Sequence, residues 1–418
     1  MATPTISVQI GLDASSFGNS YMTLGADTDT PTSAPRAVLD NTSGFGLGGT
    51  FFVEIGSYVK QLTINRGRSR ELDRYQTGTC NITFKNQDRT FDPTNTTSTL
   101  YPNIIPRRQM NVYAGGSAVF SGLVDDWDLS YDVGGLSDAS ARCVDGFALL
   151  SKQVLTAHTA TSQPSGTRIG TILSRSEVAW PTAARAIDTG QQTLQADVVA
   201  ADTNVLTYLQ LVEQTEPGSF FISSAGSAVF KDRNTASVVG TAATFTDDGT
   251  GIPYVEVSVM YGTELLYNRV SITRAGGTQQ IASNTNSIAS YGISTLDETG
   301  LLTDTDANAL TLANYLLGQY QQPELRFDQV TLELSALSAA QQASVLALDL
   351  TNVVTVKFQP NRTGTRISQN CEIIGIEHTI RVDSHRVTFR LASTFGVAFV
   401  LDSATYGKLD DTTVVLGF

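Results

Sequence analysis

Apolar and polar residues alternate in many short segments of this chain. Between Thr5 and Leu12, for example, single polar or glycine residues separate Ile6, Val8 and Ile10. A period of two places alternate side chains on one face, which predicts half-buried β-strands. The same pattern predicts further strands at Tyr58 to Arg66, Gly78 to Lys85, Gln109 to Ala114, Ala118 to Asp132 and Ala139 to Val144. Together these strands predict an antiparallel barrel or sandwich.

The spacing of apolar residues changes after residue 145. Three segments, residues 145–150, residues 167–178 and the stretch capped by Asp202 or Thr203, have apolar positions three or four apart. This spacing predicts three helices. Two strands are expected to follow, at Ser219 to Ser223 and Ala228 to Lys231. This part of the chain therefore predicts a small mixed α/β unit.

A second β-rich block begins near Pro253. An amphipathic helix over residues 305–320, capped near Thr305, is expected to be inserted into it. The expected strands are Leu266 to Arg274, Phe327 to Leu334, Val353 to Phe358 and the hairpin from Cys371 to Leu391.

The predicted fold is mainly β, of the β-rich α+β class, with two tube-like antiparallel β-barrel domains flanking a small mixed α/β insert. The expected domains are an N-terminal strand and arm (1–50), the first barrel with strand 5–12 (51–145), the α/β insert (146–240), the second barrel with its inserted helix (241–400) and a C-terminal arm (401–418).

Two pairs of segments recur in the same order along the chain. Leu62 to Gly67 resembles Val270 to Ala275, and Phe120 to Leu123 resembles Ile373 to Ile376. In each block an opening strand that ends in arginine precedes a hairpin that contains a buried glycine. This order favours two related barrels.

Charge and composition exclude several classes of protein. The net charge is −13, with 27 basic and 40 acidic residues, and such a surface repels phosphate backbones. We therefore expect no sequence-specific nucleic-acid binding. No signal peptide is visible, and no segment approaches the ~18 apolar residues of a membrane span. The three scattered cysteines are expected to be buried free thiols in a soluble protein made in a reducing cytoplasm.

Histidine is the first residue type to consider for catalysis or metal binding. His158 stands alone, whereas His378 and His385 lie in one predicted hairpin. If residues 383–384 form a two-residue turn, the two imidazoles are four rows apart, roughly 13 Å at ~3.3 Å per residue. That register excludes a shared metal, so His378 is expected to be a hydrogen-bonded core residue. No catalytic residue, cofactor or metal site is predicted.

Two groups of oxygen-bearing side chains carry weaker signals. Residues 86–95 have possible calcium ligands at mixed spacing, but they lack the glycine and terminal glutamate of a calcium loop. A self-bonded Asx turn is the preferred interpretation of this segment. Glu372, Glu377 and Asp383 could be imagined as a pair of hydrolytic carboxylates, although any chain this acidic offers many such pairs.

A basic run stands out from the acidic background. If the strand continues beyond Ile64, Arg66, Arg68 and Arg70 project on one side of it. One interpretation is a solvated strand end, for which Glu71 and Asp73 are possible internal partners. The other is a subunit interface, because arginine forms oriented, bidentate pairs with carboxylates. We predict that these three arginines make inter-subunit contacts.

The segments around this run resemble a known family. The resemblance is carried by Leu62 to Arg74, Gly78-Thr79, Asn86 to Pro93, Tyr101 to Arg108 and Phe120 to Val124, and more weakly by Tyr267 to Val270 and Ser290 to Gly292. These residues resemble the minor tail proteins of siphophages that infect actinobacteria, the baseplate-hub or tail-associated family. The likeness covers roughly residues 55 to 395, and the first 50 residues match it poorly.

The resemblance implies a non-enzymatic structural role in the virion. It implies a homotrimeric hub at the tip of a non-contractile tail, in which three subunits with two tube-like barrels each form a pseudo-six-fold ring. The implied partners are the distal tail protein, the tail tube protein, the tape measure protein and other tail-tip proteins, with DNA only passing through. Two alternatives remain open: a receptor-binding adhesin and a tail-associated cell-wall hydrolase.

Overall fold

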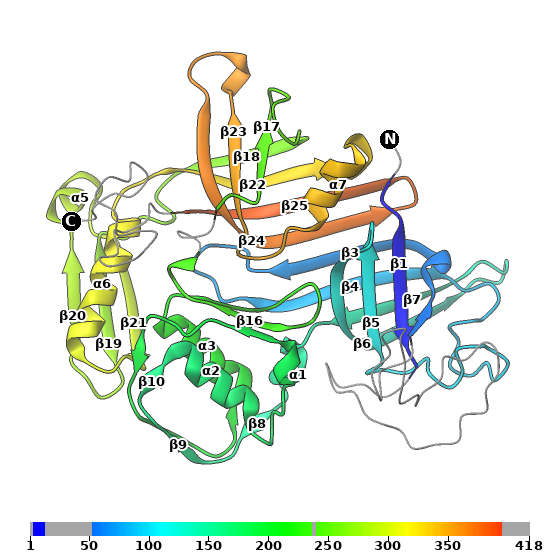
Figure 1. Cartoon of the computed structure of the whole chain (residues 1–418), viewed down its shortest axis with the longest axis horizontal. Helices are drawn as coiled ribbons and strands as arrows, with labels where there is room; N and C mark the ends of the chain where they lie inside the picture. The colour runs from blue at the N-terminus through cyan, green and yellow to red at the C-terminus, as the bar shows by residue number, and fades with distance from the viewer. Residues whose placement is uncertain (1–2, 13–51, 236–239, 395–418) are drawn as a thin grey trace, which may run out of the picture.

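The computed structural model of the chain describes residues 3–12, 52–235 and 240–394. The protein is mainly β, as the sequence predicts, and its largest element is a sheet of thirteen strands (Figure 1). The ladders of this sheet are antiparallel apart from one parallel pair. Most of the predicted N-terminal and C-terminal arms lies outside the described residues.

One half of the large sheet comes from the first part of the chain. Its strands, in spatial order, are β2 (Phe52–Glu54), β1 (Ile6–Gly11), β5 (Gln109–Ala114), β6 (Ser117–Tyr131), β7 (Ser137–Val144), β4 (Gln76–Lys85) and β3 (Val59–Gly67). Alternation explains why they form: on β4, Cys80, Ile82 and Phe84 are buried, whereas the residues between them are partly or fully exposed.

The other half comes from the last part of the chain. Its path is β24 (Ile367–Arg381), β25 (Ser384–Ser393), β22 (Leu325–Glu333) and β18 (Glu256–Tyr261), with β23 (Val353–Phe358) and β17 (Ala243–Thr246) branching from β24. β24 also pairs with β3, from Gly375 opposite Gly67 to Arg381 opposite Gln61. The two predicted β blocks are therefore hydrogen-bonded into one sheet (Figure 1). The barrel domains and their boundaries stay predictions.

Residues 147–231 form a mixed α/β unit, the green layer beside the sheet (Figure 1). Asp145 accepts the N–H groups of Gly78 and Phe147 and so ties the start of this unit to β4. The third helix is capped by Asn204, one residue beyond the predicted cap. The elements of the α/β unit are α1 (Phe147–Leu150), β8 (Val154–Leu155), β9 (His158–Ala160), β10 (Gln163–Pro164), α2 (Ser165–Ser174), β11 (Arg185–Ile187), β12 (Thr193–Leu194), β13 (Asp197–Val199), β14 (Thr203–Asn204), α3 (Val205–Thr215), β15 (Ser219–Ile222) and β16 (Ala228–Lys231).

A further unit between β18 and β22 has a small core of its own. It contains β19 (Arg269–Arg274), β20 (Gln280–Ser283), α5 (Thr285–Tyr291), β21 (Thr295–Leu301) and α6 (Asp306–Tyr320). The predicted cap at Thr305 is confirmed. The sequence did not reveal this unit because β21, Thr-Leu-Asp-Glu-Thr-Gly-Leu, has little apolar alternation. Outside it, α7 (Ala339–Leu346) begins with a capping box, and 3₁₀ turns lie at Gly56–Tyr58, Thr182–Ala184, Leu334–Ala336 and Pro360–Arg362.

The proposed duplication holds for one pair of segments and fails for the other. β6 and β24 are both 15-residue strands with a buried glycine, and each is followed by a returning antiparallel strand across a register shift. The equivalence of residues 62–67 and 270–275 is wrong. β3 belongs to the large sheet, whereas β19 lies in a separate three-stranded sheet, where it is parallel to β21.

The prediction of buried free thiols is confirmed. Cys80, Cys143 and Cys371 are all free and buried, although the first two lie directly opposite each other on β4 and β7. Of the helices within the described ranges, none combines the length and the apolar composition needed to cross a membrane.

Candidate functional site

The three arginines of the basic run have three different environments. The side chain of Arg66 is only 3% exposed, and it continues the buried face of Leu62 and Ile64. Its Nη2 donates to Asp349 at 2.7 Å and to the carbonyl of Ile222 at 3.1 Å. The charge of Arg66 is thus used to join β3 to the α/β unit and to the loop before β23.

Arg70 is the exposed member of the run. Its side chain is 68% exposed and pairs at 2.6 Å with Glu264, whose side chain is 44% exposed. A pair so accessible to solvent contributes little to the stability of one subunit. Arg70 is therefore the member of the run that is free to exchange its partner for a carboxylate on another chain.

Arg68 lies between these two and enters a pocket. Its guanidinium is 4.8 Å from the centre of the Tyr75 ring, and Nη1 makes one long hydrogen bond of 3.4 Å to the carbonyl of Asp73. Nε is buried and makes no hydrogen bond to the described residues. Burial disfavours the charged form, but Tyr75, Glu372 and Glu213 together raise the pKa of Arg68.

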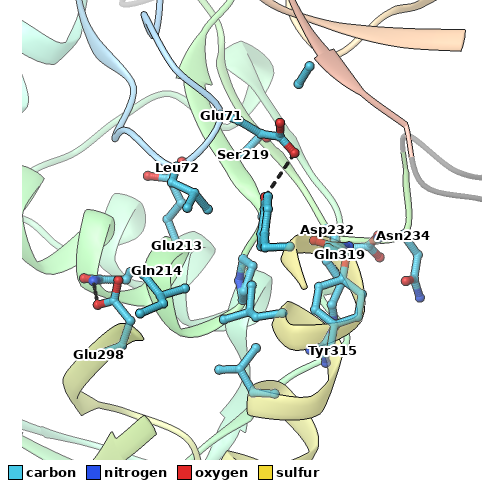
Figure 2. A pocket seen from close by; sticks show the side chains of 18 of the residues that line it. Glu71, Leu72, Glu213, Gln214, Ser219, Asp232, Asn234, Glu298, Tyr315 and Gln319 are labelled. Atoms are coloured by element: carbon cyan, nitrogen blue, oxygen red, sulfur yellow. Dashed lines mark hydrogen bonds between the residues drawn. The ribbon is translucent and has the colours of Figure 1, made fainter. Parts of the chain in front are cut away.

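The pocket has a volume of about 760 Å³ and lies where four parts of the molecule meet. Its walls are the segment after β3, the α/β unit with helix α3 and the segment after β16, the unit with β21 and helix α6, and the strands β24 and β25. Figure 2 shows Glu213 and Gln214 of α3 on one side of it, Tyr315 and Gln319 of α6 on another, and Glu71 above them. A volume of this size is typical of small-ligand sites.

Glu71 is the carboxylate of the pocket that is fully paired. It accepts a hydrogen bond of 3.0 Å from the hydroxyl of Tyr320 and forms an ion pair of 2.9 Å with Arg326. Desolvation nevertheless raises the pKa of Glu71, because its environment is poor in water. Glu71 is thus an internal partner, as one interpretation of the sequence expected, but its cation is Arg326.

Glu213 lacks such partners. Its Oε1 accepts the N–H of Phe220 at 3.0 Å, whereas Oε2 is buried and accepts no hydrogen bond from the described residues. Burial raises the pKa of Glu213 to about 7, with Arg68 and Arg74 acting in the opposite direction. A buried, unpaired carboxylate oxygen costs free energy unless it is protonated or meets a cation.

A second glutamate near the end of the same helix has hydrogen-bond donors for both of its carboxylate oxygens. Glu216 accepts hydrogen bonds from Ser165 and from the N–H groups of Gln191 and Gln192, and it lies 3.6 Å from Arg233. These contacts brace the α/β unit from within. Glu216 is thus satisfied inside the subunit, whereas Glu213 keeps one oxygen without a donor among the described residues.

Glu372 is a further carboxylate of the pocket. It lies on β24, and burial raises its pKa to about 7, partly offset by Arg68 and reinforced by Glu71. Of the three acidic residues that the sequence singled out, only Glu372 lies in this pocket. Glu377 faces Arg390 at 3.7 Å instead, and Asp383 lies in the exposed hairpin turn. The three do not form a catalytic pair.

The pocket is lined by charged groups of both signs, among them the basic residues Arg68, Arg74, Lys231 and Arg233. Neither Glu213 nor Glu372 has an ion pair among the described residues, and Arg68 supplies one positive charge between them. No histidine or cysteine is among the residues that line the pocket. Sequence reasoning missed this site because α3, α6 and β24 are brought together only by the fold.

The predicted separation of the two histidines is wrong. The turn is Val382-Asp383, one residue earlier than expected, so Ile380 pairs with His385 and His378 pairs with Val387. His378 Nδ1 is 3.0 Å from His385 Nε2. The expectation that His378 is a hydrogen-bonded core residue is confirmed.

This histidine pair is sealed from solvent. Burial, His385 and Arg66 hold the pKa of His378 well below its usual range, and burial lowers that of His385 to about 4, although Glu333 acts in the opposite direction. Both rings are therefore neutral at pH 7. In the described ranges no three histidine, cysteine, aspartate or glutamate side chains are grouped as metal ligands.

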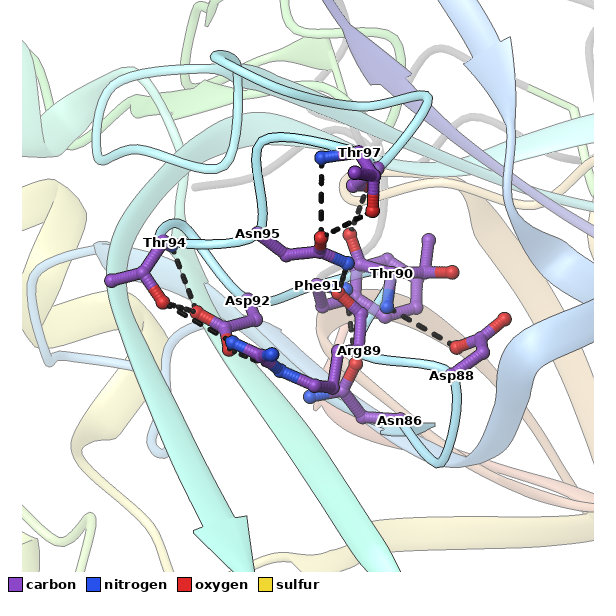
Figure 3. Close-up of polar contacts among 10 residues, drawn as sticks. Asn86, Asp88, Arg89, Thr90, Phe91, Asp92, Thr94, Asn95 and Thr97 are labelled. Atoms are coloured by element: carbon purple, nitrogen blue, oxygen red, sulfur yellow. Dashed lines mark hydrogen bonds and ion pairs between the residues drawn. The ribbon is translucent and has the colours of Figure 1, made fainter.

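The segment 86–95 is self-bonded, as preferred from the sequence (Figure 3). Asn86 accepts the N–H of Phe91 at 3.0 Å, and Asp92 accepts the N–H of Thr94 at 2.8 Å. Arg89 donates to Asp92 from two nitrogens. These side-chain oxygens are occupied by their own backbone, so they stabilise the loop after β4.

Comparison with known proteins gives similarity at the level of structure. A tail protein from Neisseria meningitidis MC58 superposes with a TM-score of 0.56 and 12% identity, covering 84% of this chain and 95% of that one. The 43 kDa tail protein of prophage MuSo2 from Shewanella oneidensis gives a TM-score of 0.55 and 12% identity, covering 83% and 96%. This chain has the fold of those tail proteins. No family model matches the sequence, and no curated protein matches it.

Proposed function

We propose that this chain is a structural subunit of a phage tail and that three copies form the hub at the tip of a non-contractile, siphophage-type tail. The observation that carries the proposal is the fold shared with two tail proteins over more than four-fifths of both chains. The ring connects the tail tube and the distal tail protein to the tip, next to the tape measure protein. It belongs to the virion and is made in the host cytoplasm.

The architecture of the sheet supports a ring of this kind. Each subunit supplies two β halves joined by the β3–β24 ladder, so three subunits supply six. The net charge of −13 suits a channel that lets DNA pass, because an acidic wall does not bind the phosphate backbone.

The role is non-enzymatic in this proposal. The large pocket offers carboxylates and arginines. Histidine, a usual base, and cysteine, a usual nucleophile, are both missing from its lining. The pocket is therefore interpreted as a binding or assembly site.

Of the three predicted interface arginines, Arg70 is the one on which the proposal mainly rests. Arg66 and Arg68 are engaged inside the subunit, whereas Arg70 reaches solvent beside Glu264. An exposed guanidinium next to a carboxylate can form the same pair with a neighbouring copy.

The test is the mass and shape of the purified full chain. Light scattering after size-exclusion chromatography is expected to give three times 44.7 kDa, and electron microscopy a ring with six lobes. Antibodies against the chain are expected to label the tail tip of intact particles. The proposal would be overturned if the chain were strictly monomeric and antibodies against it also failed to label tails.

Two further measurements separate the alternatives. A tail-associated hydrolase would clear purified cell wall in a zymogram, whereas a structural hub is expected to leave it intact. A receptor-binding adhesin would bind host cells saturably as an isolated chain, and a hub surrounded by other tail proteins is expected not to do so.

A further inference from the structure

We propose that the pocket between α3 and α6 is the docking site of this chain's own segment 395–401, Phe-Gly-Val-Ala-Phe-Val-Leu. Such docking concerns one subunit and requires neither the trimer nor the tail, so it goes beyond the proposed function. Three features of the described residues support it: the point at which the described chain ends, the pairing of charges in the pocket, and the apolar walls.

The described part of the chain ends at the pocket itself. Ala392 and Ser393, the last residues of β25, and Thr394, which follows them, are all among the lining residues. Thr394 is held in place there, because its N–H and its hydroxyl both donate to the carbonyl of Asn370, at 3.2 and 2.9 Å. Segment 395–401 therefore starts at the pocket wall, at a local concentration that no free ligand has.

Several charged groups of the pocket already have partners within the subunit. Three of them form ion pairs: Glu71 with Arg326, Lys231 with Asp188, and Arg233 with Glu216, at 2.9, 3.2 and 3.6 Å. A charged occupant would have to compete with these pairs. Segment 395–401 contains no charged residue, so it can be buried beside them without a further counter-charge.

The apolar walls of the pocket are only partly covered by the described residues (Figure 2). Leu72 is 38% exposed and belongs to neither hydrophobic core, and Leu296 and Tyr315 are half-buried. Gly318 of α6, also in the lining, leaves open space, since a Cβ there would meet no packing partner within 4 Å. A glycine inside a helix costs stability, so this gap favours the close approach of a bulky group.

The segment supplies the apolar groups that these walls lack. Five of its seven residues are large and apolar: Phe395, Val397, Phe399, Val400 and Leu401. Leaving so many apolar side chains in water is unfavourable, and the phenylalanines gain most from burial. The pocket, with a volume of about 760 Å³, has room for several of them.

The path of the segment is tested by cross-linking in the full chain. Ala398→Cys, which spares the large apolar residues, is combined with Thr311→Cys on the pocket side of α6 or with Ser368→Cys on β24. Ser368 is exposed and lies two residues from Asn370, so it is close to Thr394 but outside the pocket lining. The native cysteines are buried, so a short bismaleimide reports on the new thiols alone.

The pair with Thr311→Cys is expected to cross-link within one chain about tenfold faster than the pair with Ser368→Cys, because docking holds residue 398 beside α6. An equal rate, or a faster one with Ser368→Cys, would overturn the proposal, since the segment would then have no preference for the pocket. Cross-links between two chains would also overturn it, because the occupant would then be the segment of a neighbouring copy.

A matched pair of phenylalanine variants tests whether the segment covers the pocket. In a chain that carries Thr311→Cys, Phe399→Asp is expected to speed labelling of the thiol by about tenfold or more, because the pocket is uncovered when a phenylalanine ring is no longer buried in it. Phe418→Asp makes the same change outside segment 395–401 and is expected to leave the labelling rate unchanged. Equal rates in the two variants would contradict docking.

Discussion

Arg66 and Arg68 stand two residues apart near the end of β3, and both are drawn into the protein, yet their surroundings are opposite. Arg66 meets a carboxylate and a carbonyl at short distances, and Asp349 in turn accepts both the N–H and the hydroxyl of Ser224. Arg68 has an unpaired Nε, one long hydrogen bond and carboxylates that it does not fully satisfy. A closed network of charges holds a fold together, whereas an open one is available for binding.

The largest effect is expected where the network is closed. Asp349→Ala leaves Arg66 buried without its counter-charge, which is expected to lower the free energy of unfolding by about 3 to 5 kcal/mol. Asp138→Ala removes an aspartate from an exposed pair with Lys60 and serves as the control, with an expected loss below about 1 kcal/mol. Urea unfolding of both variants measures the difference. Similar losses would show that the Arg66 network is no more important than a surface pair.

A smaller, pH-dependent effect is expected in the open network. The pKa of Glu372 is raised to about 7, so the folded state holds its proton more tightly than the unfolded state does. The resulting stability is full below the unfolded pKa of about 4.5 and is lost as the pH rises through about 7. Glu372→Gln does not titrate, so at pH 8 it is expected to be more stable than the wild type by on the order of 2 kcal/mol.

The measurement is the free energy of unfolding of both proteins between pH 4 and pH 8, a range that spans the shift from about 4.5 to about 7. The difference is expected to vanish at the acidic end. Glu377→Gln, the same change on β24 at a glutamate that faces Arg390 outside the pocket, is the control. A Glu372→Gln variant that is destabilised equally at every pH would mean that this carboxylate is paired in the folded protein.

The smallest effect on the subunit itself is expected at Arg70. Arg70→Glu changes an exposed pair, so the free energy of unfolding is expected to move by no more than about 0.5 kcal/mol. Under the proposed function, the same variant blocks assembly of the ring. Arg142→Glu, which reverses another exposed arginine on β7, is the control and is expected to assemble normally. Ring formation by Arg70→Glu would remove this arginine from the interface.

Much of the β structure could be read from alternation. Strands β5, β16 and β23 have the predicted bounds, because their apolar residues alternate or run together between clear turns. Alternation also places Arg66 on the same face as Leu62 and Ile64, which is the buried one. Its partner Asp349 lies 283 residues further along, so no local pattern could show that the charge is satisfied internally.

The remaining errors have two different physical causes. The β24–β25 turn lies one residue earlier than predicted. Because a change of register affects every pair along a ladder, this shift brings two histidines that were expected to be far apart within hydrogen-bonding distance. The pocket was not predicted because its glutamates come from four separate segments, the one after β3 and those of α3, β21 and β24. A local turn decides the first, and long-range assembly decides the second.

The ladder between β3 and β24 also sets the order in which the protein can be completed. β3 is made early, but the strand that covers its free edge ends at Arg381, near the end of the described chain. Until then, a growing chain carries an uncovered strand edge, which is a template for wrong pairing between neighbouring nascent chains. Contacts this distant in sequence also slow folding. Formation of the β3–β24 ladder, which unites the two halves, is thus the folding step that depends most on the progress of synthesis on the ribosome.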